Sequence, residues 1–389
     1  MSAPTVRLWL GTSPETDDAG DGGIWSVDLD GPADPAGTAG APAPVLRART
    51  PAPSFLALTP DGRSLFAAGE TSPGAVTRFV VGPDGRLAEA ERVSSGGSGP
   101  CHLLLDPSGR ALYVANYASG SVAVVPLRPD ASIAGGVAQV FEHSGRGPVR
   151  DRQEGPHVHS TALTPDGAVL LAFDLGTDEI RRYRVRADGL LDADGVALRL
   201  PPGTGPRHAA WGPGDHLYVT GELDASVHVL AWDGARLRPV EVAGDLSAGG
   251  GEALAAHVVR QGGLLLASVR GPDVVGLWRI ADGGARLEHL GAVPVGAVGA
   301  AWPRHFALLD EGVAPPGEVP AAVGLVVAGQ RSDVVAVLRV DPMGGSAGGS
   351  ARGPAGGPGV LSTGEPVLHG PVPAPTCVVM GRVALPDAR

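Results

Sequence analysis

The feature that most constrains this chain is a sevenfold repeat of short apolar segments, each preceded by a proline or a glycine. Successive copies lie about 45 to 56 residues apart, with a longer interval before the last, which is the spacing of propeller-type repeats. The seven segments begin at Ser54, Cys101, His157, Arg207, Glu252, Arg304 and Thr376. Pro-Asp-Gly sequences recur between segments, and their aspartates (Asp61, Asp84 and Asp166) are expected to be turn residues.

Each copy continues with further strand-like segments. In the copy that begins at Cys101, residues 112–116 and 121–125 are the second and third, and a weaker fourth segment ends most copies, as at 86–90. Four antiparallel strands repeated seven times predict an all-β fold, the seven-bladed β-propeller. Residues 6–10, 24–29 and 44–49 have no first strand before them, and residues 376–380 form a first strand without followers. We therefore expect the N-terminal strands to pair with the C-terminal strand and close the ring.

This closure makes residues 1–389 a single predicted domain, in which 1–50 and 372–383 share one blade. Three stretches rich in proline, glycine and alanine interrupt the repeat, and we expect them to be surface insertions. They cover about residues 33–43, 313–322 and 343–359.

The charge composition excludes several classes of function. Net charge is −11, which argues against general nucleic-acid or anionic-membrane binding, and no apolar run is long enough to span a bilayer. All 30 basic residues are arginines, so a Schiff-base lysine and a Walker-type phosphate loop are impossible. Cys101 and Cys377 fall on non-adjacent blades and predict no disulfide. With no signal-peptide pattern at the N-terminus, a cytoplasmic location is expected.

The repeat also predicts where a site lies. In an antiparallel blade the first strand starts at the edge where the second strand ends, so both positions meet at one rim of the propeller. On four consecutive blades these positions are rich in reactive side chains, as an anionic substrate and acid–base chemistry require. They are His157, Arg207, Glu222, Arg270, Arg304 and Gln330. The loop 143–154 reaches the same rim, and His159 shares a strand face with His157.

Simpler explanations exist for several of these residues. Arginines at blade starts can pair with acids of neighbouring blades, and we expect at least one of Arg207, Arg270 and Arg304 to be structural. His102, His208 and His305 recur at one position of the repeat, which favours packing over metal binding. Residues 174–178 lack the spacing of a calcium loop. We expect neither a metal nor an organic cofactor.

Several stretches resemble the seven-bladed-propeller lactonases, a family that includes bacterial 6-phosphogluconolactonases and fungal carboxymuconate-lactonising enzymes. The similar stretches include 99–102, 152–160, 173–176, 205–208, 221–222, 303–306 and 328–330. The resemblance implies His157, Arg207, Glu222 and Arg270 as catalytic residues. It leaves His159, Arg152, Arg304, Gln330 and Asp174 as candidates for substrate binding. Around Arg270 this chain has Val269 and Pro272, where family members often have asparagine and histidine.

The resulting prediction is a hydrolase of carbohydrate metabolism, in the pentose phosphate pathway, that opens a sugar-acid lactone similar to 6-phosphogluconolactone. Glu222 or His157 would activate water, and Arg207 and Arg270 would stabilise the oxyanion and bind an anionic group. The expected partner is a small anionic lactone, without nucleic acid or membrane, and the protein is expected to be a monomer or a weak homodimer. Two alternatives stay open: a non-catalytic binding platform, and a lactonising enzyme acting on a carboxylated substrate. A metal-dependent lactonase or a redox propeller is disfavoured, because no clear ligand set or haem-attachment motif is present.

Overall fold

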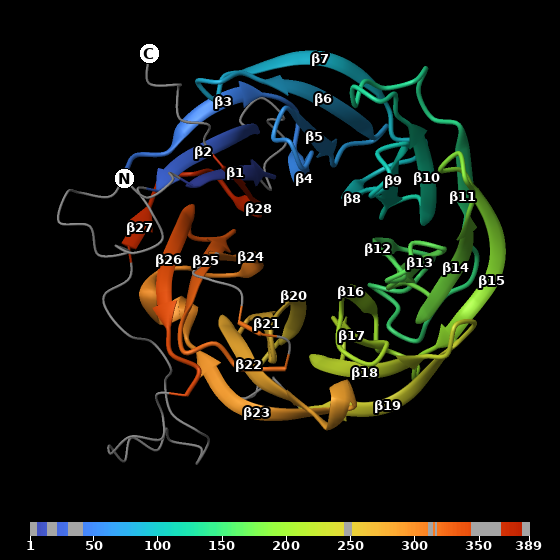
Figure 1. The fold of residues 1–389 in the computed structure, drawn as a ribbon, viewed down its shortest axis with the longest axis vertical. Coiled ribbons are helices and arrows are strands. Elements are labelled where there is room, and N and C mark those ends of the chain that lie inside the picture. The colour runs from blue at the N-terminus through green and yellow to red at the C-terminus, as the bar shows by residue number, and fades with distance from the viewer. Residues whose placement is uncertain are drawn as a thin grey trace. The chain divides into compact units, whose positions relative to one another are not determined.

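The structure is a computed structural model that describes residues 6–13, 22–29, 42–244, 251–309, 314–315, 317–343 and 367–382. In these residues the strands form seven four-stranded antiparallel sheets, accompanied by two short 3₁₀ segments, η1 (Asp282–Gly284) and η2 (Val295–Val298). These sheets are the blades of a seven-bladed β-propeller, so the predicted fold class is confirmed (Figure 1). The chain groups into two compact units, which we describe in turn. That the whole chain is one domain stays a prediction.

The first unit comprises residues 1–31, 44–206 and 373–389 and holds four blades. Its closure blade has the strand order β28 (Pro375–Arg382), β1 (Val6–Thr12), β2 (Gly23–Leu29) and β3 (Val45–Arg49). The next blade contains β4 (Pro53–Leu58), β5 (Ser64–Gly69), β6 (Ala75–Val81) and β7 (Leu87–Ser94). Then come β8 (Pro100–Leu105), β9 (Ala111–Asn116), β10 (Ser121–Pro126) and β11 (Gln139–Glu142). The last blade contains β12 (Val158–Leu163), β13 (Val169–Asp174), β14 (Glu179–Val185) and β15 (Leu191–Arg199).

The second unit comprises residues 32–43 and 207–372 and holds three blades. The first contains β16 (Pro206–Trp211), β17 (His216–Gly221), β18 (Ser226–Trp232) and β19 (Leu237–Ala243). The second contains β20 (Leu254–Gln261), β21 (Leu264–Arg270), β22 (Val274–Ala281) and β23 (Arg286–Val293). The third contains β24 (Pro303–Leu309), β25 (Val323–Gly329), β26 (Val334–Val340) and β27 (Val367–His369).

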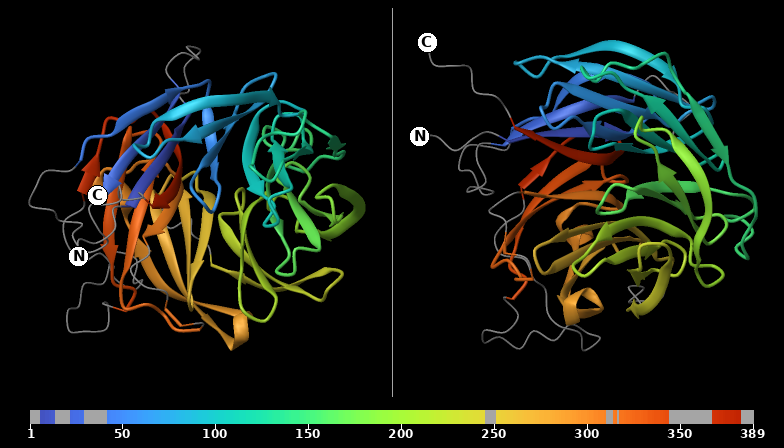
Figure 2. Two further views of the ribbon diagram at one scale, coloured as in Figure 1. Left: turned by 45° about the horizontal axis from the view of Figure 1, so that its top comes forward. Right: turned by 45° about the vertical axis from the view of Figure 1, so that its right-hand side comes forward.

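The closure blade joins the two ends of the described chain. Strand β1 pairs antiparallel with β2 on one side and with β28 on the other, so that Leu8 faces Val27 and Met380. Figures 1 and 2 show β28 beside β1 in every view. The predicted pairing of N-terminal strands with a C-terminal strand is therefore confirmed.

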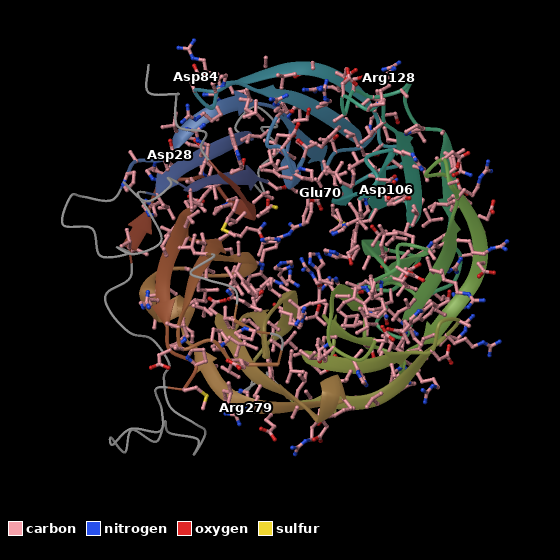
Figure 3. The ribbon with its side chains drawn as sticks, in the orientation of Figure 1. Asp28, Glu70, Asp84, Asp106, Arg128 and Arg279 are labelled. Atoms are coloured by element: carbon pink, nitrogen blue, oxygen red, sulfur yellow. The ribbon has the colours of Figure 1, made fainter. Side chains whose placement is uncertain are left out.

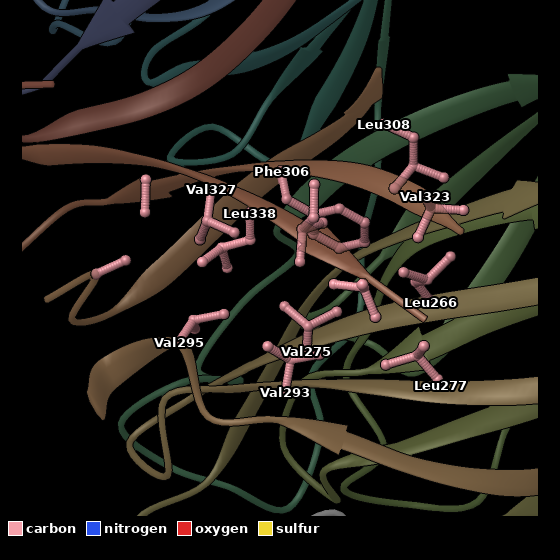
Figure 4. Close-up of a cluster of buried hydrophobic side chains, with 14 of the residues drawn as sticks. Leu266, Val275, Leu277, Val293, Val295, Phe306, Leu308, Val323, Val327 and Leu338 are labelled. Carbon is pink, nitrogen blue, oxygen red and sulfur yellow. The ribbon is translucent and has the colours of Figure 1, made fainter. Parts of the chain in front are cut away.

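Inner strands of blades that have a neighbour on either side within their own unit are buried on both faces. All residues of β9 and of β21 are buried, and both strands are nearly continuous apolar runs, as expected for two-sided burial. In the second unit the packed layer between the blades of β20–β23 and β24–β27 includes Phe306, Leu266 and Val327 (Figure 4). Removing such apolar surface from water is the main force holding neighbouring blades together.

Two tyrosines add a directional bond to this packing. The hydroxyl of Tyr113 on β9 donates to the carbonyl of Gly189 in the next blade at 3.1 Å, and both belong to the first unit. In the second unit the hydroxyl of Tyr218 on β17 donates to the carbonyl of Gly284 at 3.0 Å. Burial raises the pKa of both phenols, so each stays a neutral donor.

The Pro-Asp-Gly turns behave as predicted. Asp61 accepts hydrogen bonds from the Thr59 hydroxyl at 2.6 Å and from the Arg63 backbone N–H, and Gly62 takes the left-handed conformation at φ 70°. Asp166 makes the equivalent bonds in its own turn. The threonine hydroxyl lowers the pKa of each aspartate, which identifies both as turn-stabilising carboxylates.

Two further predictions concern the cysteines and the surface insertions. Cys101 and Cys377 are buried and form no disulfide, as expected. Of the predicted insertions, residues 33–41, 313, 316 and 344–359 lie outside the described residues. Within the described part of the chain, no helix has the length and hydropathy that crossing a membrane demands.

Candidate functional site

The second unit brings together three of the four predicted catalytic residues. Arg207 is the second residue of β16, Glu222 directly follows β17, and Arg270 ends β21. Arg207 Nε and Arg270 Nη2 each lie 2.7 Å from the same oxygen, Glu222 Oε2. Arg207 and Glu222 are each 1% exposed, and Arg270 is 8% exposed. The repeat brought these side chains together because each occupies the same end of its blade.

This arrangement favours particular roles for its members. Two guanidiniums stabilise the negative charge of one carboxylate, so Glu222 is better suited to orienting the arginines than to accepting a proton. The trio keeps one net positive charge in a buried position, which suits an oxyanion or an anionic group of a substrate.

Glu70, the repeat counterpart of Glu222, follows β5 in the first unit (Figure 3).

His157, the fourth predicted catalytic residue, belongs to the first unit and is described with its own neighbours. Its ring stacks on Tyr117 at 4.4 Å between centroids with 16° between the planes. Nδ1 lies 3.0 Å from the Tyr117 carbonyl oxygen, which can only accept, so Nδ1 carries the proton. Nε2 lies 3.0 Å from Glu154 Oε1, whose side chain is 62% exposed. The Glu154 carboxylate can also only accept, so the contact at Nε2 fits an N–H donor, and Nε2 becomes available as a base when that proton has left.

Glu154 is a carboxylate in this contact. The Glu154 backbone N–H, which bonds its own side chain, is the main cause of a lowered pKa, and His157 and Arg152 lower it further. Glu154 therefore stabilises the protonated form of His157 whenever that ring has taken up a proton.

Behind His157 lies a buried hydrogen-bonded chain. Asp174 Oδ1 accepts the backbone N–H of His157 at 2.8 Å, and Asp174 Oδ2 accepts from His143 Nδ1 at 2.6 Å. The other ring nitrogen of His143 lies 2.7 Å from the Tyr183 hydroxyl. The side chains of His143 and Asp174 are fully buried, and burial raises the pKa of Tyr183. The chain Tyr183–His143–Asp174 therefore fixes the backbone position of His157.

Asp174, a predicted substrate-binding residue, lies inside the protein. We expected Asp174 to contact substrate, but its side chain is 0% exposed and both of its oxygens accept hydrogen bonds inside the protein. Its position at the end of β13 makes it a support for His157. His143 and Tyr183 were not identified as functional from the sequence, because no spacing rule links a residue that follows β11 with residues on β13 and β14.

The loop that precedes His157 is anchored by Gln153. This side chain is 0% exposed, and its amide nitrogen donates to the Leu175 carbonyl at 2.9 Å and to Asp178 Oδ1 at 2.8 Å. Gly176 allows the close approach, because a Cβ there would lie 1.9 Å from the Gly155 carbonyl oxygen. Gln153 thereby fixes the backbone position of its neighbours Arg152 and Glu154.

The remaining predicted binding residues divide between the two units. In the first unit Arg152 is half-buried, and His159 is 6% exposed with its ring edge-on to Tyr117. In the second unit Arg304 is half-buried on β24, and Gln330 is 7% exposed and donates its backbone N–H to Trp302. Their role in binding stays a prediction.

The structure shifts the predicted repeat alignment in two blades. A β-bulge interrupts the inner strand at Cys101 in one blade, at His159 in the next and at Arg304 in a third. His159, and not His157, is therefore the structural counterpart of Cys101 and Arg304. Glu252 precedes β20, whose irregularity falls between Ala255 and Val258.

The corrected alignment adds one histidine to the recurring set. His257 on β20 lies between His208 and His305, with Nδ1 2.7 Å from Nδ1 of His208 and its ring stacked on His305 at 3.8 Å. These contacts support the predicted packing role. Among the described residues, no group of three or more His, Cys, Asp or Glu side chains has an arrangement that could hold a metal ion.

Comparison with known proteins agrees with this architecture. The sequence model of the family described as "Lactonase, 7-bladed beta-propeller" matches residues 8–360. The match extends over most of the chain, including all four predicted catalytic positions. The chain belongs to this enzyme family.

Individual relatives and structures are similar over most of the fold. The chain is 29% identical to the 6-phosphogluconolactonase of Bacillus subtilis, over 68% of this chain and 76% of that protein. It is 28% identical to the 6-phosphogluconolactonase of Formosa agariphila, over 74% and 81%. The solved structure of the periplasmic gluconolactonase of Pseudomonas aeruginosa has a TM-score of 0.78 and 29% identity, covering 98% of this chain and all of that one.

Proposed function

We propose that this protein hydrolyses a sugar-acid lactone that carries an anionic group, with 6-phosphogluconolactone as the first substrate to test. The observation that carries the proposal is the buried trio of Arg207, Glu222 and Arg270, with two guanidiniums on one carboxylate oxygen and one positive charge in excess. A hydrolytic transition state develops negative charge on the lactone carbonyl oxygen, and preorganised arginines stabilise such charge. The names of the relatives support the choice of lactone.

In this proposal His157 is the general base. The Tyr117 carbonyl holds its Nδ1–H, and Nε2 takes a proton from the water that adds to the lactone carbonyl carbon, while Glu154 stabilises the imidazolium. The ring C–O bond then breaks, and Nε2 returns the proton to the leaving alkoxide. Glu222 keeps the two arginines in place. The same groups, run in reverse, would close a hydroxy acid into a lactone, so lactonisation is measured alongside hydrolysis.

The test is hydrolysis of freshly prepared 6-phosphogluconolactone and of unphosphorylated gluconolactone, with and without chelator, against an enzyme-free blank. We expect chelator-resistant turnover of the phosphorylated lactone. His157→Ala should lower kcat by about 10² to 10⁴-fold, the usual loss when a general base is removed. Arg236→Gln, at an exposed turn position, serves as the folded control.

The outcome that rejects the proposal is a purified, folded protein that accelerates neither lactone. If it accelerates them but His157→Ala and Arg270→Gln both keep the wild-type rate, the lactonase activity stands and the assigned residues are wrong.

A further inference from the structure

The residue before the inner strand adopts a left-handed conformation in five blades. In four of them this residue is small, with φ of 37° at Ala52, 60° at Gly99, 61° at Gly205 and 41° at Ala374. In the fifth blade the position holds Trp302, at φ 59°. Left-handed backbone favours glycine and is a true outlier for a bulky residue. The fold therefore needs this backbone shape, but it does not need an indole there.

Hydrogen bonds hold Trp302 in this conformation. Its backbone N–H donates to Asp273 Oδ1 at 3.0 Å, and its carbonyl accepts from the Gln330 backbone N–H at 3.3 Å. All three residues belong to the second unit. A bulky residue kept in an unfavourable conformation by its surroundings is typical of functional positions.

Two arginines approach the indole of Trp302. The guanidinium carbon of Arg331 lies 3.4 Å from the ring centroid, and that of Arg270 lies 5.6 Å from it. These two distances limit the separation of the two guanidinium carbons to about 9 Å. Trp302 thus connects the buried Arg207–Glu222–Arg270 trio with a second cation at the surface.

Arg331 has the properties of an anion anchor. Its side chain is exposed, and no carboxylate of the described residues forms an ion pair with it. A guanidinium lying with its face on an aromatic ring keeps its edge N–H groups for bidentate hydrogen bonds to an oxyanion. Arg207, Arg270 and Arg331 carry three positive charges, against two negative charges on Glu222 and Asp273.

We propose that Trp302 and Arg331 form a second oxyanion-binding subsite, which binds a phosphate monoester remote from the lactone carbonyl. The buried trio stabilises the charge on the carbonyl oxygen. This inference rests on the proposed function and makes Arg331 the residue that distinguishes a phosphorylated sugar lactone from its unphosphorylated counterpart. A carboxylate at the same place on the substrate would offer Arg331 the same kind of oxyanion. A carboxylated lactone therefore tests whether the subsite binds a carboxylate instead of a phosphate.

The experiment compares kcat/KM for 6-phosphogluconolactone, unphosphorylated gluconolactone and a carboxylated lactone in wild type, Arg331→Gln and Arg236→Gln. Arg236 is also exposed, in the turn between β18 and β19, so the charge change is matched. We expect Arg331→Gln to lower kcat/KM for the phosphorylated lactone about tenfold, mainly through KM, and to leave the unphosphorylated lactone unchanged. A loss confined to the carboxylated lactone would overturn the phosphate assignment.

Trp302→Gly provides a second variant that separates binding from folding. Glycine relieves the left-handed strain, so the midpoint of unfolding should stay the same or rise, while kcat/KM for the phosphorylated lactone should fall. Equal effects of Arg331→Gln on the phosphorylated and unphosphorylated lactones, or an effect no larger than that of Arg236→Gln, would overturn the inference.

Failure of the proposed function is distinguishable from failure of the subsite. If wild type hydrolyses none of the lactones, calorimetric binding of 6-phosphogluconate still tests the subsite. Binding that weakens about tenfold in Arg331→Gln but not in Arg236→Gln would support it. Absence of binding to wild type, or equal binding to both variants, would reject it.

Discussion

Replacing Glu222 with glutamine is the most informative change to the buried trio. Glutamine keeps the shape of the side chain and removes its charge, so Arg207 and Arg270 remain buried without their shared carboxylate. Two unit charges 2.7 Å apart attract each other by about 6 kcal/mol at an effective dielectric constant of about 20. Removing one partner of a buried ion pair usually costs about 3–5 kcal/mol. We expect Glu222→Gln to lower the free energy of unfolding by about 3–5 kcal/mol.

Urea unfolding followed by tryptophan fluorescence measures this loss, since the chain has 6 tryptophans. Glu252→Gln is the matched control, because Glu252 is exposed and lies just before β20 in the same unit; we expect a change within about 0.5 kcal/mol. Adding Arg270→Gln to Glu222→Gln should recover part of the loss, because one of the two buried cations that lost the Glu222 carboxylate is removed as well. Similar small losses in Glu222→Gln and Glu252→Gln would refute the reasoning.

Three further predictions concern other contacts. Tyr113→Phe removes the bond to the Gly189 carbonyl and should cost about 0.5–1.5 kcal/mol in urea unfolding, and an unchanged midpoint would mean that packing alone joins the two blades. Burial lowers the pKa of His369, so the unfolded chain binds more protons, and stability should fall as the pH drops below about 6.5. His369→Gln should flatten this part of the stability profile, and a profile that stays equally steep would contradict it. His143→Gln breaks the support of Asp174 and should lower kcat about tenfold or more with little change in KM, whereas unchanged kinetics would show that His157 holds its position unaided.

The strand repeat was predictable because every blade must bury both faces of its inner strands, and that requirement recurs along the sequence. The alignment of the repeat copies was not predictable in two blades. In five blades a proline opens the inner strand, as Pro100 does in β8, but Pro156 lies two residues before β12 begins. Aligning the copies on proline therefore moved His157 into the place that His159 occupies. The blade of β20 has no proline at its start, so Glu252 was aligned on a glycine instead.

The candidate site was predictable only where it follows the repeat. Arg207, Glu222 and Arg270 occupy equivalent blade ends, so their convergence could be expected, and the structure shows the expected pairing of an arginine with an acid. The support from His143 could not be expected, because hydrogen bonds between distant strands leave no periodic signal. Trp302 did leave a signal, since the other copies with proline at the strand start carry alanine or glycine there.

The pairing of β1 with β28 has a consequence for how the protein is made. About 360 residues separate the two strands, so at about 5–20 residues per second a ribosome needs roughly 20 to 70 s after β1 to supply its partner. Throughout that time one backbone edge of β1 stays open to pairing with any other extended chain. A message cut short anywhere before the codon for Pro375 would leave that edge open permanently. A chain released before β28 is made therefore keeps an unpaired strand edge, which is prone to pairing with other chains.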